Sequence, residues 1–553
     1  MSSDFCDRVA GALASRNLAL FLGAGVSNPS GLPTAPQIVT AILCALKDSL
    51  RSPLTCSSEF GPSFSDKMRI EYLCRTLAEV DARLGLLPLT PLARGEPTSV
   101  HYFVAACAKA GDVKYIVTTN FDLLIERALD ALGVAYAVLC TEDQYCDVEQ
   151  SDSRCFLVKL HGSLDASTGQ PLPGIVADVR AVGKGLSDAR ARTLGRIARE
   201  RSLLFLGYSG RDYFGAMPIL FACKPQPVFW VDHVPSETLC SRNVTNWITA
   251  GTGGQYVQMT TGDLLRELAV RGGISHESGN PARVDVHYSF VDHMSELEKA
   301  FALTWLYSRD LEGNVQVLHK SFEDCEKLPG SADDDNRLLL ARLYRRWVST
   351  MERVGRSSLH VHSYIKAVDM LQKAHSIAPS DSPLALDIEV ALCDMQFRVA
   401  WLSGGSGIQF LPSIEMLIDR CLAINDHEIL ARAYSTKAGI CQHGFGKSNE
   451  SLAMALEADD RAAEALEVVG AQDMLPVLYF HMFKLALALG ESTRAASALM
   501  RCLAGTLLTA HSPDDEFVVV LASMAKQMAD HQQYRDSREI IFDRLSALGL
   551  SSA

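Results

Sequence analysis

The first half of the chain alternates short apolar runs with stretches whose apolar residues recur at helical spacing. Five runs are nearly continuous and rich in branched or aromatic residues, which is typical of strands buried on both faces of a sheet. Helical patterns, for example at 121–132 and 187–200, lie between them. The alternation predicts an α/β doubly wound parallel sheet with right-handed crossovers. The five predicted strands are residues 18–22, 114–118, 156–160, 203–206 and 228–231.

The pattern changes near residues 275–290, a polar stretch with Gly, Pro and Ser that is typical of a linker. Beyond it, strand-like runs almost disappear and apolar residues recur at helical spacing in successive blocks, for example at 296–307 and 363–377. We therefore predict an α/β domain over residues 1–280 and an all-α domain over residues 281–553. A helical-repeat solenoid and an irregular helical bundle both agree with the second pattern.

One helical block has a more specific spacing. Ala367, Leu371, Ala374 and Pro379 resemble the second helix of a tetratricopeptide repeat, in which small residues let two helices approach closely and proline ends the helix. Residues 489–502 follow the same spacing more loosely, and no regular self-repeat runs through the domain. The resemblance is local, and it predicts a tetratricopeptide-like helical-repeat domain.

Charge and cysteine usage narrow the class of protein. The net charge of −13 argues against primary nucleic-acid binding, because phosphate contacts need a basic surface. The chain has fifteen cysteines, and no two of them have Cys-x-x-Cys spacing. This pattern favours reduced thiols in a cytoplasmic protein over a disulfide framework. The first residues do not have the pattern of a signal peptide, and the apolar runs are too short to cross a bilayer. We expect a cytoplasmic protein with no membrane contact.

A glycine-rich segment, Gly23-Ala24-Gly25-Val26-Ser27, directly follows the first predicted strand. Glycines at this place let the backbone approach a pyrophosphate, and a following helix N-terminus favours its negative charge. The ordinary dinucleotide-binding pattern is incomplete, because Asn28 stands where a third glycine belongs and Asp48 is the nearest candidate for the usual downstream acid. A tight turn without a ligand therefore remains an alternative for this segment alone.

Further polar and glycine residues follow the other predicted strands. Residues 118–122 (Thr-Thr-Asn-Phe-Asp) follow the second, 160–163 (Leu-His-Gly-Ser) the third and 207–212 (Gly-Tyr-Ser-Gly-Arg-Asp) the fourth, and Asp232 ends the fifth. In a parallel sheet the carboxyl ends of all strands meet at one edge, where ligands bind. The sequence therefore predicts one ligand site built from several strand ends.

These segments resemble the NAD-binding fold of the sirtuin family. Residues 23–27 with Gly31-Leu32-Pro33, then 118–122, 159–163 and 207–210, occur in the family's order and approximate spacing, and the likeness covers residues 10–270. It implies a Rossmann-type domain that binds NAD. The residues it implies for binding are Gly23, Ala24, Gly25 and Ser27 at the diphosphate, Thr119, Gly207 and Ser209 at the phosphate–ribose side, and Asp232 at the adenosine ribose.

The resemblance also implies three catalytic residues. Asn120 would hydrogen-bond the nicotinamide ribose or the attacking water, and Asp122 would orient the carboxamide. His161 would act as general base, since imidazole exchanges its proton near neutral pH. Structural alternatives stay open: a helix cap for Asn120 or Asp122, a packed histidine at a strand end for His161, a loop acid for Asp232, and a surface pair of Arg211 with Asp212. His101, in a Pro-x-x-x-His helix start that also resembles the family, is interpreted as structural.

Two departures from the family decide the subfamily. Cys140, Cys146 and Cys155 do not have the paired spacing of the zinc module of protein deacylases, so we expect no zinc. The Asp-Phe-Arg turn of the deacylases is replaced by Thr34-Ala35-Pro36. The chain therefore resembles the sirtuin-like NAD hydrolases of prokaryotic anti-phage defence. That resemblance implies release of nicotinamide and ADP-ribose, a homo-oligomer (dimer or tetramer), and an activating protein or nucleotide ligand that acts through the helical domain.

Two other functions stay open. A protein deacylase would need zinc and a groove for acyl-lysine, and a non-catalytic adaptor would sense NAD while its helical domain binds a partner. Retention of both Asn120 and His161 favours an enzyme, because a pure binding module requires neither. The identity of the trigger, linear versus cyclic ADP-ribose as product, and a lid formed by residues 34–95 are questions that the sequence leaves open.

Overall fold

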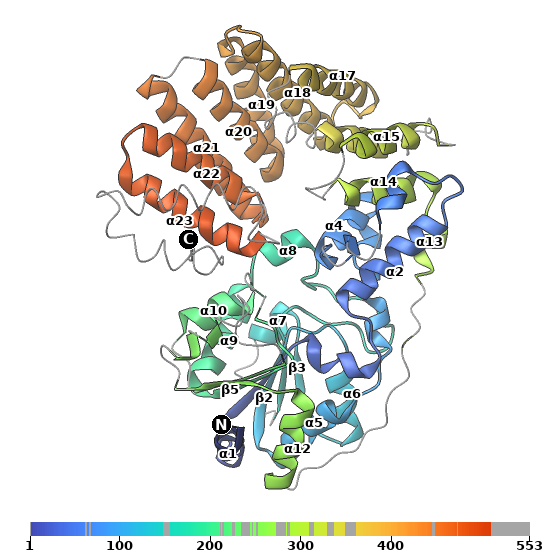
Figure 1. Cartoon of the computed structure of the whole chain (residues 1–553), viewed down its shortest axis with the longest axis vertical. Helices are drawn as coiled ribbons and strands as arrows, with labels where there is room; N and C mark the ends of the chain where they lie inside the picture. Colours follow the sequence, from blue (N-terminus) through green and yellow to red (C-terminus); the bar gives the residue numbers. More distant parts are fainter. Residues whose placement is uncertain are drawn as a thin grey trace. The chain divides into compact units, whose positions relative to one another are not determined.

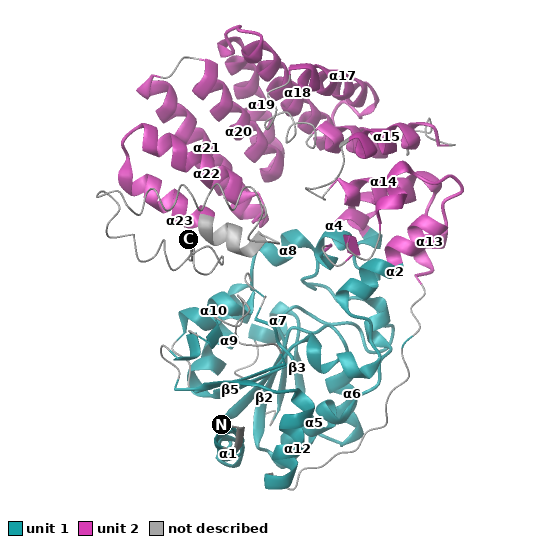
Figure 2. Ribbon diagram, viewed as in Figure 1, with its two compact units in different colours: residues 1–41, 69–74, 83–287 teal, residues 42–68, 75–82, 288–553 magenta. Residues whose placement is uncertain are grey.

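The computed structural model divides the chain into two compact units, which we describe separately (Figure 2). Unit 1 comprises Met1–Ala41, Arg69–Cys74 and Arg83–His287, and unit 2 comprises Ile42–Met68, Arg75–Ala82 and Tyr288–Ala553. The predicted boundary between residues 280 and 281 lies outside the described residues. The structure describes residues 2–60, 64–65, 68–146, 155–210, 212, 215–223, 227–233, 244–245, 247–249, 253–272, 284, 288–308, 315–328, 337–348, 361–444, 448–472 and 474–509.

Unit 1 is built on a seven-stranded sheet with the order β3-β4-β2-β1-β5-β6-β7, in which every neighbouring pair is parallel. The predicted doubly wound fold is confirmed, and each of the five predicted strands is present. The chain reverses its direction of progress across the sheet between β1 and β5, which is the place where ligands bind in such sheets. The strands are β1 (Leu18–Leu22), β2 (Val113–Thr118), β3 (Ala137–Leu139), β4 (Phe156–Lys159), β5 (Ser202–Leu206), β6 (Val228–Asp232) and β7 (Gln255–Gln258).

Helices cover both faces of this sheet, which explains why its central strands are largely apolar (Figure 1). On β1, Leu18, Leu20 and Leu22 pack on one face while Ala19 and Phe21 pack on the other, as the two-residue period of a strand requires. The first face is covered by α1 (Ser2–Ala14), α5 (Ser99–Ala110), α6 (Leu124–Ala131) and α12 (Thr261–Gly272). The second is covered by α7 (Glu142–Cys146), α9 (Asp188–Glu200) and α10 (Ala216–Ala222).

Within the described residues of unit 2 every regular element is a helix, and helices that follow one another in the chain pack together (Figure 1). Contacts join α17 with α18, α19 with α20, α20 with α21, and α22 with α23. Residues 337–348 form a further helix. The helices are α13 (Phe290–His293), α14 (Glu296–Tyr307), α15 (Val315–Glu326), α17 (Val361–Ile377), α18 (Pro383–Leu402), α19 (Leu411–Ile424), α20 (His427–Gly444), α21 (Asn449–Val469), α22 (Leu475–Ala488) and α23 (Ser492–Thr509).

The small residues of the predicted tetratricopeptide-like block are buried on a helix that packs against the next one. Ala367, Leu371 and Ala374 are buried on α17, and Ser382 begins α18 by accepting a hydrogen bond from the amide of Ala385 (3.1 Å). In the looser second block, Ala495 and its neighbours at helical spacing on α23 are also buried. Close packing of consecutive helices agrees with a helical repeat, and a tetratricopeptide-like domain stays our proposal.

A segment from the first half of the chain belongs to the helical unit. Residues 42–68 contain the end of α2 (Ala35–Asp48) and η3 (Thr55–Glu59), and 75–82 contain the end of α4 (Ile70–Val80). The backbone amide and hydroxyl of Thr55 both donate to Asp324 (3.0 and 2.7 Å). Much of the segment considered as a lid is therefore bonded into unit 2. Among the helices that the structure describes, none combines the length and apolarity needed to cross a bilayer.

Candidate functional site

The turn after β1 and the turn after β5 touch backbone to backbone. The amide of Gly23 donates to the carbonyl of Leu206 (3.0 Å), and the amide of Gly25 donates to that of Gly207 (2.9 Å). A side chain at Gly25 would place its Cβ 2.8 Å from the Cα of Gly207, and Gly207 itself has a φ of +60°. The glycines are thus needed for contact between the two turns. The element that follows Gly23 is a short 3₁₀ turn, η1 (Ala24–Val26), on which Ala24 is exposed.

Replacing Gly207 by alanine should destabilise unit 1 by about 3 kcal/mol, because it adds a backbone clash to left-handed strain. Gly111 provides a matched control, since its φ is +75° and no atom lies within 4 Å of an added Cβ. Gly111→Ala should therefore cost only about 1 kcal/mol, from strain alone. Urea unfolding of the two variants would measure the difference. Equal losses of stability would contradict the importance of the contact between the turns.

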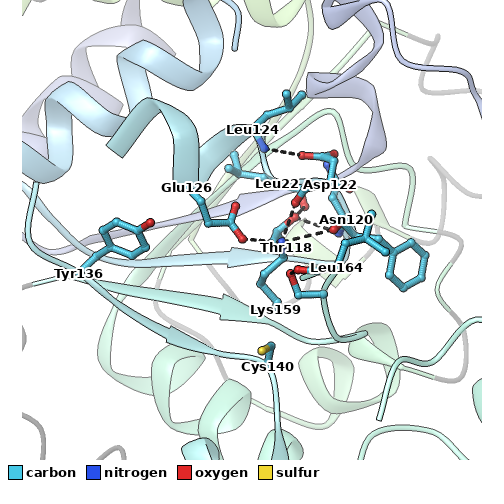
Figure 3. Close-up of polar contacts among 12 residues, drawn as sticks. Leu22, Thr118, Asn120, Asp122, Leu124, Glu126, Tyr136, Cys140, Lys159 and Leu164 are labelled. Atoms are coloured by element: carbon cyan, nitrogen blue, oxygen red, sulfur yellow. Dashed lines mark hydrogen bonds and ion pairs between the residues drawn. The ribbon is translucent and has the colours of Figure 1, made fainter. Parts of the chain in front are cut away.

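Asn120 connects the end of β1 with the end of β2. Its side-chain amide donates to the carbonyl of Gly23 (3.1 Å) and to the hydroxyl of Ser27 (3.1 Å). Its backbone amide donates to the hydroxyl of Thr118 (3.0 Å), which in turn donates to the carbonyl of Leu22 (2.9 Å; Figure 3). These bonds fix the half-buried Asn120 side chain beside the glycine turn, as an amide that positions a substrate must be fixed.

Asp122 is 7% exposed, and its carboxylate is held inside the protein. One oxygen accepts from the Ser27 hydroxyl (2.7 Å), and the other accepts from the amide of Leu124 at the start of α6 (3.1 Å; Figure 3). The first bond joins the β1 turn to the β2 turn, and the second stays within the β2 turn at the start of α6. They favour the structural alternative for Asp122, while its contact with a carboxamide stays a prediction.

A buried ion pair lies beneath the turn formed by residues 120–122 (Figure 3). Lys159, at the end of β4, is 1% exposed, and its ammonium donates to Glu126 (2.7 Å) and to the backbone carbonyl of Asp122 (2.6 Å). Burial raises the pKa of the Glu126 carboxyl, and the neighbouring Lys159 only partly offsets this effect. In the sequence, Lys159 stands out only as the first residue of the 159–163 motif. A charged residue inside an otherwise apolar strand is the signal of such a pair.

His161 follows β4, and its ring faces an acidic partner. Its Nε2 lies 3.2 Å from a carboxylate oxygen of Asp212, and its ring centroid is 6.4 Å from that of Phe121, the neighbour of Asn120. The sequence alternative paired Asp212 with Arg211, which lies outside the described residues; the contact that the structure describes is with His161. This contact cannot be inferred from local sequence, because the two residues lie far apart in the chain.

Asp212 is itself held by the chain that follows it. Its carboxylate accepts hydrogen bonds from the amides of Gly215 and Ala216 (both 2.9 Å) at the start of α10. Burial opposes ionisation of this carboxyl, but His161 and the two amides outweigh burial and lower its pKa below the ordinary value. The residue is therefore an anion with a fixed position.

The other predicted binding residues lie at the same edge of the sheet. Thr119 follows β2, and its amide donates to the carbonyl of Leu22 (3.4 Å). Ser209 is exposed two residues after Gly207, and Asp232 ends β6 with its carboxylate 3.4 Å from the ring of His233. The strand order brings these residues, with Gly23, to neighbouring strand ends. Contact of any of them with NAD stays a prediction.

His101 has a structural role at the start of α5. Its Nδ1 accepts from the backbone amide of Thr98 (3.0 Å), which completes a capping box. Burial lowers the pKa of His101 to about 4, although nearby Asp122 opposes the shift. The imidazole is therefore neutral at physiological pH, which agrees with the structural interpretation made from the sequence.

The three cysteines considered as zinc ligands differ in their exposure to solvent. Cys140 and Cys155 are buried, whereas Cys146 is exposed. Burial raises the pKa of both buried thiols, which opposes the thiolate form that binds metal. Within the described residues, no three His, Cys, Asp or Glu side chains gather as metal ligands; residues 147–154 lie outside this description.

Comparison with known proteins gives one family match. Residues 114–214 match a family model described as "SIR2-like domain", a range that includes Asn120, Lys159, His161 and Asp212. The match supports a sirtuin-like fold for unit 1. No curated protein matches the chain.

Solved structures similar to this chain include one described as "Sir2 bound to acetylated peptide" (17% identity, TM-score 0.29, covering 49% of this chain and 99% of the other). Another is a Sir2 homolog–NAD complex (16% identity, TM-score 0.30, covering 48% and 93%). A third is described as "Structural Basis for the Mechanism and Regulation of Sir2 Enzymes" (16% identity, TM-score 0.26, covering 49% and 100%).

Proposed function

We propose that unit 1 is an NAD hydrolase that cleaves the bond between nicotinamide and ribose. The observation that carries the proposal is the fixed side chain of Asn120, hydrogen-bonded to Gly23 and Ser27 and one strand away from a histidine with a carboxylate partner. The family match over residues 114–214 supports the same interpretation. An amide and a base beside a glycine turn are the groups that this reaction needs.

Hydrolysis of the N-glycosidic bond of NAD mainly requires that the enzyme position the ribose and the attacking water. Nicotinamide in NAD is a pyridinium cation, so it leaves with the electron pair of the broken N-glycosidic bond and becomes neutral. The ribose passes through an oxocarbenium-like transition state, as sugars do in glycosidases. Asn120 holds the ribose or the water, and the water oxygen forms a new bond to the anomeric carbon. His161 accepts the proton of that water and then releases it to solvent. The products are nicotinamide, ADP-ribose and one proton.

We infer the position of the dinucleotide from the strand ends. Gly23, Ala24, Gly25 and Ser27 would hold the diphosphate, with the exposed backbone of Ala24 and Gly25 facing it. Thr119, Gly207 and Ser209 would line the phosphate–ribose side, and Asp232 would accept hydrogen bonds from the adenosine ribose. No zinc is required for any of these steps.

At the level of the cell, we propose an anti-phage effector that depletes NAD after activation. A toxic hydrolase needs a resting state, so we infer a homo-oligomer whose activity depends on an activating protein or nucleotide ligand bound to the helical domain. Stacked helices commonly bind protein. Light scattering that gives a monomer under active conditions would contradict the oligomer.

The experiment that tests the enzyme is an assay of nicotinamide release. The purified full chain is incubated with NAD, alone and with lysate of phage-infected cells, and nicotinamide is measured by chromatography. NADH is the matched control substrate, because its neutral dihydropyridine is a poor leaving group. Release from NAD and not from NADH is the expected result. NAD binding without turnover under every condition would favour an adaptor, and stoichiometric zinc with deacylation of an acetyl-peptide would favour a deacylase.

A further inference from the structure

Asp212 and His161 form a pair that joins two distant parts of the chain. His161 stands directly after β4, whereas Asp212 lies between β5 and α10, and the gap between Nε2 and the carboxylate oxygen is 3.2 Å. Both side chains are largely buried, at 15% and 10% exposure. A contact of this kind orients an imidazole and selects the nitrogen that carries its proton.

The absence of a side chain at Gly215 leaves space for the Asp212 carboxylate. A Cβ added to Gly215 would lie 2.5 Å from an oxygen of Asp212, so a side chain at that position would displace it. The amides of Gly215 and Ala216 hold both oxygens at 2.9 Å. The guanidinium of Arg69 also interacts electrostatically with Asp212, but its direct partner is Glu71 (3.1 Å). Asp212 is therefore positioned by its own turn and is available to His161 as a hydrogen-bond acceptor.

We propose that Asp212 is a positioning residue that fixes His161 with its proton on Nε2 and leaves Nδ1 as the basic atom. The assignment rests on the proposed NAD hydrolase for its catalytic part. A carboxylate only accepts hydrogen bonds, so the ring nitrogen facing it must donate. The described residues offer Nδ1 no hydrogen-bond partner, and this nitrogen is then the one that takes a proton from water or a ribose hydroxyl.

The catalytic part is tested by the kinetics of Asp212→Asn. We expect kcat for nicotinamide release to fall about 100-fold, while KM for NAD changes less than about twofold, because the residue acts on the base and not on NAD. The matched control is Asp178→Asn, since Asp178 accepts from two amides at the start of α8 (Val179–Gly183; 2.8 and 3.1 Å) and has no histidine partner among the described residues. This control should keep kcat. An unchanged kcat in folded Asp212→Asn would overturn the proposal.

The positioning part is tested without turnover, in the wild-type chain. Nitrogen-15 NMR of labelled histidine, assigned with His161→Gln, should show Nε2 protonated, its proton slow to exchange with solvent, and Nδ1 bare. A His161 protonated on Nδ1 would overturn the proposal, even where Asp212→Asn fails to fold. Gly215→Ala, which displaces the carboxylate without removing it, should speed exchange of the Nε2 proton. If the wild-type chain releases no nicotinamide, the proposed function fails, and the ring state alone then decides whether Asp212 positions His161.

Discussion

Asn120→Ala and His161→Ala are each expected to lower nicotinamide release from NAD by at least about 100-fold, the scale on which a positioned acid, base or hydrogen-bonding group contributes. The reason differs between them. Asn120→Ala removes the amide that would hold ribose or water, whereas His161→Ala removes the group that takes the proton. Both side chains reach solvent in part, so their removal leaves no large cavity.

The measurement is the initial rate of nicotinamide release by the full chain under the activating condition found for the wild type. Asn28→Ala is the matched control, because Asn28 lies exposed in the same β1 turn, on η2 (Asn28–Ser30). It should retain wild-type activity, and circular dichroism should show all three variants folded. Full activity in both Asn120→Ala and His161→Ala would remove the basis of the site assignment.

The second large effect is on stability. Lys159→Met leaves Glu126 buried without its cation and should lower the free energy of unfolding of unit 1 by about 3–5 kcal/mol. It also removes the bond that holds the backbone of Asp122, so activity should fall with stability. The double variant Lys159→Met/Glu126→Leu replaces the pair by apolar side chains and should recover most of the stability, because no unpaired charge is left.

An exposed ion pair gives the control for this prediction. Lys437 and Glu415 in unit 2 have nearly the same spacing (2.8 Å), but their side chains are 24% and 48% exposed. Lys437→Met should therefore cost less than about 1 kcal/mol. Urea unfolding combined with amide hydrogen exchange in β2 and α20 would measure both changes. Similar losses for the two lysine variants would mean that burial of the Lys159–Glu126 pair has little energetic importance.

The five strands found from the sequence are almost wholly buried: only Lys114 on β2 is exposed, and Asp232 on β6 is partly exposed. β1 and β5 lie in the centre of the sheet, covered on both faces, and their apolar runs are continuous. The two strands that it missed are the edges of the sheet. β3 has only three residues, and β7 begins and ends with glutamine and is only partly buried. An edge strand needs neither length nor apolar sides, so composition does not distinguish it from a loop.

Site residues that lie next to a predicted strand could be predicted from the sequence. Contacts between residues far apart in the sequence could not. Asn120 and His161 were placed at the sheet edge because each lies within two residues of an apolar run, and the resemblance to the sirtuin family implied their roles. The contact of Asp212 with His161 depends on how the turn after β5 folds back, and the pairing of Lys159 with Glu126 depends on the placement of α6 against β4. Neither distance is encoded by local spacing. The sequence also does not show that residues 42–68 belong to the helical unit. Their place there involves hydrogen bonds between distant residues, such as that of Thr55 with Asp324.

The contact between the turns at Gly25 and Gly207 restricts how this protein can diverge. Each glycine excludes a Cβ because the other backbone occupies the space, so a mutation at one position is not relieved by a mutation to any larger residue at the other. We therefore expect both positions to remain glycine in related proteins, independently of the ligand that they bind. In a set of related sequences, loss of one glycine should therefore coincide with a change in the length of a turn rather than with a compensating side chain.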